Sequence, residues 1–144
     1  EYVSFPRAKF KDGSLDFSYS GLKTAVLYHL QKLSPEEREL HKADIAASFQ
    51  TAAVEILVEN SMKALEQLQI NQLALAGGVA CNSLLRKRMQ EECRKRKYRL
   101  FFPPPDLCTD NAAMIARAGL FYLERGTRSD FSLSPKPSLS LQKN

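Results

Sequence analysis

Two short stretches of the sequence carry residues whose types and spacing suit chemistry. The first holds Gly77, Gly78 and Asn82, and it follows an uncharged apolar run at residues 73–76. Adjacent glycines leave no Cβ between the backbone and a ligand, so their N–H groups can hold a nucleotide or phosphate while the Asn82 amide hydrogen-bonds ribose or phosphate. A tight strand-to-helix turn followed by an ordinary asparagine N-cap explains the same residues equally well.

The second stretch is Thr109, Asp110 and Asn111, which comes shortly after three consecutive prolines. An aspartate between a strand and a helix points into the crevice where α/β sheets bind ligands, and there it can serve as a hard metal ligand or as a general base. The alternative is that Thr109 or Asp110 caps the last helix, a position that hydrogen bonding and the helix dipole favour. Taken by itself, the local pattern favours the cap.

Basic residues gather between Arg86 and Arg99, where eight Lys or Arg residues stand against two Glu in a chain whose formal net charge is +5. Contacts from such residues to phosphates would give salt-dependent affinity for a nucleic acid. A solvated helix face is the alternative, and the lack of interleaved aromatic residues favours it. His29 and His41 are isolated from each other in the sequence, which favours surface or capping roles over a metal site.

Alternating strands and helices must position these residues. The pattern predicts a strand at about residues 72–76, buried on both faces, and a second strand at 98–102. A basic helix at 82–97 joins them, and its inner face repeats every four residues at Leu85, Met89 and Cys93. The prolines at 103–105 must then leave the sheet, because they cannot donate to a ladder. Short connections of this kind predict an α/β fold with parallel pairing.

Further helices are expected on both sides of this unit. Upstream, Ser20 is expected to cap a first helix, and residues 34–37 form a second helix start with a capping serine and a proline. A long helical pattern at 42–69 is expected to break near 40–44. Downstream, a last helix ends at Gly126. Its expected buried positions are Met114, Ile115, Ala118, Phe121 and Tyr122.

The cysteines indicate the redox environment. The chain has an odd number of cysteines, Cys81, Cys93 and Cys108. Their spacings fit neither a zinc ribbon nor a Cys-x-x-Cys redox pair. Both observations favour unpaired thiols in a reducing compartment. No apolar run is long enough for a membrane span, and the basic, interrupted N-terminal stretch does not fit a signal peptide. The first residue is Glu1 rather than methionine, so the chain is expected to be a fragment.

Three motifs occur in order along the chain, at residues 17–24 (FSYSGLKT), 75–82 (LAGGVACN) and 108–116 (CTDNAAMIA), and residues 134–137 (SPKP) follow them. Together they resemble the C-terminal part of the TsaD family of tRNA threonylcarbamoyladenosine-forming transferases, formerly described as O-sialoglycoprotein endopeptidases. The resemblance implies an α/β fold of the actin/Hsp70 ATPase type, in which two ribonuclease-H-like lobes hold a nucleotide between them. It also implies transfer of a threonylcarbamoyl group from threonylcarbamoyl-AMP to N6 of the adenosine 3′ to the tRNA anticodon.

The resemblance implies site residues and partners as well. Gly77 and Gly78 would line the nucleotide site, which takes ATP or threonylcarbamoyl-AMP, and Asn82 would contact the substrate. Asp110 matches a carboxylate ligand of one divalent metal per subunit, iron or zinc, with Lewis-acid and template roles. No residue is assigned as the general base. The implied partners are tRNA and, in bacteria, a TsaB-like paralogue and a TsaE-like ATPase, in the cytoplasm and without a membrane.

The family's other two metal ligands form a His-x-x-x-His pair upstream of the first motif. This chain has no such pair, and His29 and His41 do not replace it. Residues 1–144 are therefore expected to be an incomplete, helix-rich second lobe, truncated on its N-terminal side, with residues 127–144 as a tail. Alone it is expected to bind metal weakly, to transfer nothing and to self-associate through an uncovered apolar face. The alternatives are another actin-fold, ATP-using carbamoyltransferase or kinase, and a basic RNA-binding module without catalysis.

Overall fold

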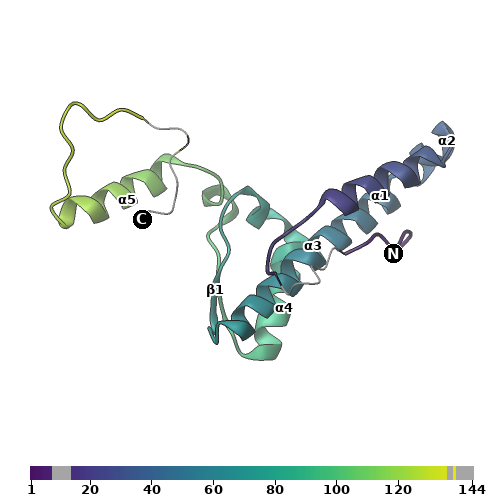
Figure 1. Cartoon of the computed structure of the whole chain (residues 1–144), viewed down its shortest axis with the longest axis horizontal. Helices are drawn as coiled ribbons and strands as arrows, with labels where there is room; N and C mark the ends of the chain where they lie inside the picture. The colour runs from purple at the N-terminus through teal and green to yellow at the C-terminus, as the bar shows by residue number, and fades with distance from the viewer. Residues whose placement is uncertain (8–13, 136–137, 139–144) are drawn as a thin grey trace. The chain divides into compact units, whose positions relative to one another are not determined.

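The structure, a computed structural model, describes residues 1–7, 14–135 and 138 of the chain (Figure 1). Its elements are, in order, α1 (Ser20–Gln31), α2 (Pro35–Leu40), α3 (Lys42–Gln67), β1 (Gln72–Ala74), the 3-10 turn η1 (Gly78–Cys81), α4 (Ser83–Arg96), β2 (Arg99–Phe101), the 3-10 turn η2 (Pro105–Leu107) and α5 (Ala112–Glu124). The chain divides into two compact units, Glu1–Thr109 and Asp110–Asn144. This helix-rich arrangement with a small sheet is compatible with part of an α/β domain, the class expected from the sequence.

Helix α3 is the central element of the first unit, and it packs against both α1 and α4 (Figure 1). Toward α1, the buried cluster consists of Phe5, Leu22, Ile45, Ala52 and Ile56. Toward α4, it consists of Val54, Val58, Met62, Leu65, Leu85, Met89 and Cys93. The long helix expected at 42–69 is therefore present, and it ends at Gln67. No helix in the described part of the chain combines the length and apolar character that crossing a membrane requires.

The start of α2 follows the sequence prediction closely. The Ser34 hydroxyl accepts a hydrogen bond from the Glu37 N–H at 3.2 Å, and the Glu37 carboxylate accepts one from the Ser34 N–H at 2.8 Å. Two backbone donors that the helix leaves unpaired are thereby satisfied reciprocally. The break between α2 and α3 falls at His41, inside the predicted range. Both local predictions are confirmed.

The start of α1 differs from the prediction. Ser20 is the first residue of the helix, and Tyr19 precedes it without a side-chain cap. The Lys23 N–H donates to the Tyr19 carbonyl at 2.8 Å, which places Ser20 inside the first turn rather than before it. The Ser20 carbonyl in turn accepts the Thr24 hydroxyl at 3.0 Å. The predicted Ser20 cap is therefore wrong.

Strands β1 and β2 pair in parallel, with Leu73 opposite Leu100, and α4 crosses between them. The inner face of α4 is buried as predicted, at Leu85, Met89 and Cys93. Each strand is three residues long, shorter than predicted. The expectation of a strand buried on both faces is wrong within the described residues: Leu73 is half-buried, whereas Gln72 and Ala74 are exposed. The reason is that the cluster formed by α3 and α4 packs against one side of the pair, where each strand contributes its central residue, Leu73 or Leu100.

Truncation of Met89 should test the α3–α4 core. Its side chain is 1% exposed, so Met89→Ala should lower the free energy of unfolding by about 2–5 kcal/mol through lost burial and a residual cavity. Met114→Ala is the matched control, because Met114 is 51% exposed and its truncation should change the free energy by less than about 0.5 kcal/mol. Urea unfolding of the two variants measures both values, and equal losses would contradict this description of the core.

The second unit contains α5, whose N-cap is Asn111. Its Oδ1 accepts a hydrogen bond from the Met114 N–H at 3.0 Å. The prediction that Thr109 or Asp110 caps this helix is therefore wrong. All three side chains can cap, and the extended backbone that a cap requires is found at Asn111, with φ −152° and ψ 155°. The helix ends as predicted, because Gly126 follows it with a φ of 77°.

The predicted inner face of α5 is exposed in the described chain. It comprises Met114, Ile115, Ala118, Phe121 and Tyr122, and no residue of α5 is buried. The burial prediction is wrong because periodicity identifies an apolar face but not the element that covers it. Of the tail expected at 127–144, residues 127–135 have no helix or strand, and residues 136–137 and 139–144 lie outside the described residues, including the end of the SPKP pattern.

Candidate functional site

The turn between β1 and α4 requires glycine at only one of its two glycine positions. Gly77 has a φ of 85°, in the left-handed region that favours glycine. At Gly78, an added Cβ would meet only the Thr109 Cγ2, at an ordinary contact distance of 3.7 Å. Turn geometry therefore explains Gly77 and leaves Gly78 without a structural requirement. The bare backbone at Gly78 suits the close approach of a ligand.

Asn82 uses both ends of its carboxamide. Its Oδ1 accepts the Leu85 N–H at 3.0 Å and so caps α4, while its Nδ2 donates to the Gln50 Oε1 on α3 at 3.3 Å. The capping interpretation is thus correct for Asn82. The Asn82 side chain can still form further hydrogen bonds, because its amide nitrogen carries a second hydrogen and its oxygen a second lone pair. Asn82 can therefore cap the helix and contact a ligand at once.

Asn82 lies at a pocket of about 570 Å³ in the first unit. The apolar part of the pocket is formed mainly by Phe49, Ala53, Val54, Leu57 and Leu85. Its polar side chains are those of Tyr19, Lys23, Gln50 and Asn82. A concave, mostly apolar site with a few convergent polar groups is typical of small-molecule binding. Tyr19 and Lys23 belong to residues 17–24 and Asn82 to residues 75–82, so the fold brings two of the sequence motifs to one pocket.

Arg86 ties the glycine turn to the segment after β2. Its guanidinium donates to the carbonyl of Ala80 in the turn and to the carbonyl of Pro103, the latter at 2.8 Å. It also donates to the Cys108 Sγ at 2.9 Å and lies 4.6 Å from the centre of the Phe102 ring. Arg86 therefore stabilises the turn from inside, and it is not one of the cations available to a nucleic acid.

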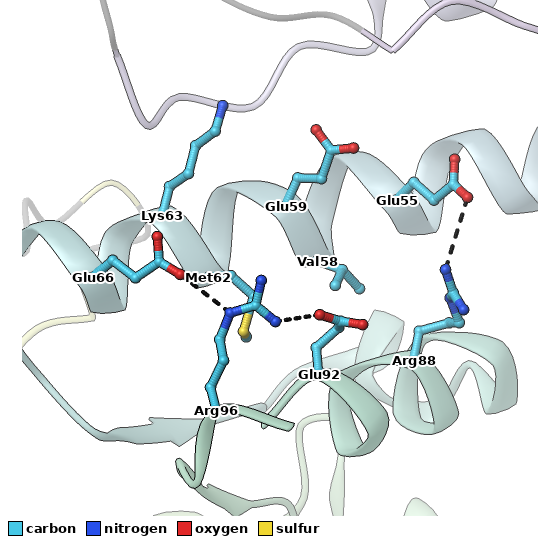
Figure 2. A pocket seen from close by; sticks show the side chains of 9 residues that line it. All are labelled: Glu55, Val58, Glu59, Met62, Lys63, Glu66, Arg88, Glu92 and Arg96. Carbon is cyan, nitrogen blue, oxygen red and sulfur yellow. Dashed lines mark hydrogen bonds and ion pairs between the residues drawn. The ribbon is translucent and has the colours of Figure 1, made fainter. Parts of the chain in front are cut away.

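Helices α3 and α4 enclose a charged groove of about 380 Å³, shown in Figure 2. Arg96 of α4 pairs with Glu66 of α3 at 3.1 Å and with Glu92 of its own helix. Arg88 reaches Glu55 at 4.0 Å. These charges neutralise one another across the two helices, so the groove is a packing contact between α3 and α4 rather than a ligand site.

The outward face of α4 stays basic. Lys87, Arg94 and Lys97 are exposed, and they form no ion pair within the part of the chain that the structure describes. Lys95 differs, because its Nζ lies 2.6 Å from the Glu92 carboxylate. That contact, together with a second hydrogen bond, lowers the pKa of Glu92 below its usual range. The basic run predicted from the sequence thus separates into internally paired cations, these three exposed ones, and Arg99, which lies over the Phe101 ring.

Asp110 is the first residue of the second unit and is exposed. Because Asn111 caps α5, the cap does not occupy the Asp110 carboxylate. Among the described residues, no group of three or more His, Cys, Asp or Glu side chains could hold a metal ion. A transition-metal site needs such a group, so the described residues by themselves do not fit the iron or zinc that the resemblance implies.

The two histidines take part in aromatic packing near the N-terminus. His41, between α2 and α3, stacks on Tyr2 with ring centres 4.6 Å apart. His29 packs edge-on against Tyr2 and Phe5, at 6.4 Å and 5.9 Å. Their contacts stabilise the attachment of the N-terminal segment to the helices.

The glycine turn and the pocket beside Asn82 both belong to the helix-rich first unit. Comparison with known proteins gives the family: the model for TsaD, described as tRNA N6-adenosine threonylcarbamoyltransferase, matches residues 1–117. The chain therefore belongs to the TsaD family.

Relatives in three clostridia carry the same description, tRNA N6-adenosine threonylcarbamoyltransferase. The chain is 50% identical over 139 residues to the protein of Clostridium beijerinckii, covering 96% of this chain and 41% of the relative. It is 48% identical over 139 residues to that of Clostridium perfringens, with the same coverage of 96% and 41%. With Clostridium botulinum the identity is 45% over 141 residues, covering 98% and 42%. The chain thus spans about two fifths of the length of the curated relatives it matches.

Three polar residues of the pocket were not assigned a role from the sequence. Gln50 lies 32 residues before Asn82 in a continuous helical pattern, so no local signal marks it. Tyr19 and Lys23 stand inside the first motif, and only the packing of α1 beside α3 brings them to the pocket. Burial raises the pKa of Tyr19 above its usual range, so its hydroxyl stays protonated and available as a donor.

Proposed function

We propose that this chain is part of an enzyme that transfers a threonylcarbamoyl group from threonylcarbamoyl-AMP to N6 of the adenosine 3′ to the tRNA anticodon. Membership of the TsaD family and the names of its relatives support this activity over another actin-fold carbamoyltransferase or kinase. The observation that carries the proposal is the convergence on one pocket of Tyr19 and Lys23 with Val79 and Asn82. A turn with a purely structural role would not require the first two motifs to share a pocket.

In this proposal the nucleotide, ATP or threonylcarbamoyl-AMP, lies over Gly77 and Gly78 and contacts Asn82 at the pocket. The lack of a structural requirement for a glycine at Gly78 supports this placement. The Lys23 ammonium is suited to a phosphate at the same pocket. Asp110 is proposed as one ligand of a divalent iron or zinc, a site that the described residues do not complete. The residue that removes the proton from the adenosine amine stays unassigned.

For the whole protein we propose an actin-like fold of two lobes. Residues 1–144 would form part of the second lobe, with residues 127–144 as a tail. The partners would be tRNA, a TsaB-like paralogue and a TsaE-like ATPase, in the cytoplasm, as the family implies. An apolar surface over β1 and β2, which includes Leu75, Phe101 and Phe102, supports a sheet that continues in the whole protein. In the isolated chain the same surface would favour self-association.

A chimera provides the test of this function. In it, the present chain replaces the matched segment of the Clostridium beijerinckii relative. Cells depleted of their own enzyme should regain threonylcarbamoyladenosine when they express the chimera, measured by mass spectrometry of nucleosides from purified tRNA. A folded chimera that binds tRNA but restores no modified adenosine would contradict the enzymatic proposal and favour an RNA-binding module without catalysis.

Binding of tRNA is expected to depend on the exposed cations of α4. A double variant, Lys87→Gln with Arg94→Gln, should weaken binding and reduce the slope of log affinity against log salt by about 0.7–0.9 for each phosphate that is no longer neutralised. Lys95→Gln is the matched control, because Lys95 is already paired with Glu92. Titrations of tRNA at several salt concentrations measure the slopes. Identical slopes for the unchanged chain and the double variant would exclude this face from the RNA interface.

A further inference from the structure

The glycine turn and the segment after β2 each place one thiol at the same point of the first unit. Cys81 closes η1 and Cys108 directly follows η2, where the Cys108 N–H donates to the Pro105 carbonyl at 3.2 Å. The Cys81 Sγ also donates to the Pro105 carbonyl at 3.2 Å, and the Cys108 Sγ to the Pro103 carbonyl at 3.7 Å. Two cysteines that are well separated in the sequence thus face each other across two turns.

Arg86 fixes both segments around the sulfur atoms. It donates to the Ala80 carbonyl next to Cys81, to the Pro103 carbonyl, and to the Cys108 Sγ itself at 2.9 Å. Because one planar guanidinium bonds to both segments, their separation is held constant. The folded chain therefore holds the two cysteine-bearing segments beside each other.

The exposure of the two thiols differs in a way that suits stepwise chemistry. Cys81 is exposed, whereas Cys108 is buried. The third cysteine, Cys93, is buried in the α3–α4 cluster. A small oxidant can therefore reach Cys81 first, and Cys108 is the second thiol beside the Pro105 carbonyl that both cysteines share.

We propose that Cys81 and Cys108 form a modification site that closes reversibly to a disulfide by exchange with a small-molecule disulfide of the glutathione class. The Cys81 sulfur attacks one sulfur of the oxidised glutathione, so that its S–S bond breaks and one glutathione thiol leaves with the Cys81 proton. The Cys108 sulfur then attacks the Cys81 sulfur of this mixed disulfide, and the second glutathione thiol leaves with the Cys108 proton. The chain loses two hydrogens and two electrons, and oxidised glutathione is reduced to two thiols.

The site is independent of the proposed transferase activity, because its chemistry needs only the two thiols and the fold that holds them. It also differs from the outcome expected for an isolated exposed cysteine. An isolated thiol stops at the mixed disulfide, whereas a contacting second thiol completes the exchange. The ratio of intramolecular disulfide to glutathione adduct therefore reports the contact directly.

The experiment is an exchange titration of the full chain. The chain is incubated with mixtures of reduced and oxidised glutathione, quenched with acid, alkylated and examined by intact-mass and peptide mass spectrometry. We expect a mass loss of two hydrogens, a linked peptide pair containing Cys81 and Cys108, and at least about tenfold more of it than glutathione adduct at millimolar glutathione. Cys93 should react with the alkylating agent only after denaturation, because it is 2% exposed.

Two variants provide the controls. Cys81→Ser changes an exposed side chain and keeps a hydroxyl that can donate to the Pro105 carbonyl, so it should fold and lose no hydrogens. Cys93→Ala should form the disulfide as the unchanged chain does. A persistent glutathione adduct on Cys81 without ring closure would overturn the proposal. So would a disulfide that includes Cys93, or an equal loss of two hydrogens from the Cys81→Ser variant.

Discussion

In the chimera, replacing Asn82 with aspartate is expected to lower the proposed threonylcarbamoyl transfer strongly while leaving α4 folded. Aspartate caps helices as well as asparagine does, so the hydrogen bond from the Leu85 N–H to the side-chain oxygen should persist. The free energy of unfolding should therefore change by less than about 0.5 kcal/mol. The variant loses the Nδ2 donor, and with it the hydrogen bond to Gln50. It also places a negative charge where the nucleotide phosphate is proposed to lie. Together these changes should lower kcat/KM by at least about 100-fold, equivalent to about 3 kcal/mol.

Two measurements on the chimera separate the two roles of Asn82. Urea unfolding reports the cap, and the rate of tRNA modification reports the ligand contact. Asn82→Ala removes both the cap and the amide, so it should cost about 1 kcal/mol of stability in addition to activity. An Asn82→Asp variant that keeps full activity would show that the Asn82 amide serves only the helix and the hydrogen bond to Gln50.

Replacing Asp110 with asparagine is expected to remove activity and metal without affecting the fold. Asp110 is exposed and Asn111 provides the cap of α5, so the free energy of unfolding should change by less than about 0.5 kcal/mol. Loss of a proposed metal ligand should lower both the metal affinity and the rate of transfer in the chimera by more than about 100-fold. This loss is larger than the one caused by removing a residue that only hydrogen-bonds to a metal ligand. Metal analysis of dialysed protein and the rate of tRNA modification provide the two readouts.

Asp106→Asn is the matched control, because Asp106 is another exposed aspartate only a few residues away, in η2. It should change neither metal content nor activity. The unchanged chain by itself should retain less than one iron or zinc per molecule after dialysis, since a single carboxylate is a weak site. One tightly bound metal per isolated chain, or full activity in the Asp110→Asn variant, would contradict the proposed role of Asp110.

Local signals were sufficient for the features that depend on neighbours in the sequence. The start of α2 depends on adjacent residues, and its capping serine, Ser34, and the proline that follows were predicted correctly. The same holds for Met89 and its buried neighbours on α4, because a four-residue spacing defines one face of a helix. The parallel pairing of β1 and β2 followed from the helix that joins them.

Features that depend on distant partners were not predictable in this way. The apolar face of α5 was expected to be buried, but only a covering element can bury it, and the described residues include none. Three adjacent capping residues precede α5, and the backbone path selects Asn111 among them. Gln50 meets Asn82 only because α3 and the start of α4 pack together. The sequence motifs pointed to the pocket, while three-dimensional packing supplied its remaining polar groups.

Helix α3 contributes to both hydrophobic clusters of the first unit, and the pocket lies where the clusters meet. Tyr19 and Ala53 pack against one cluster, while Leu57 packs against the other, and all three line the pocket. A ligand in the pocket would bridge the two halves of the unit. Its binding free energy would then add to the stability of the whole unit, by mass action, rather than to that of one end. Ligand binding in the pocket and cooperative folding of the first unit would then be thermodynamically coupled.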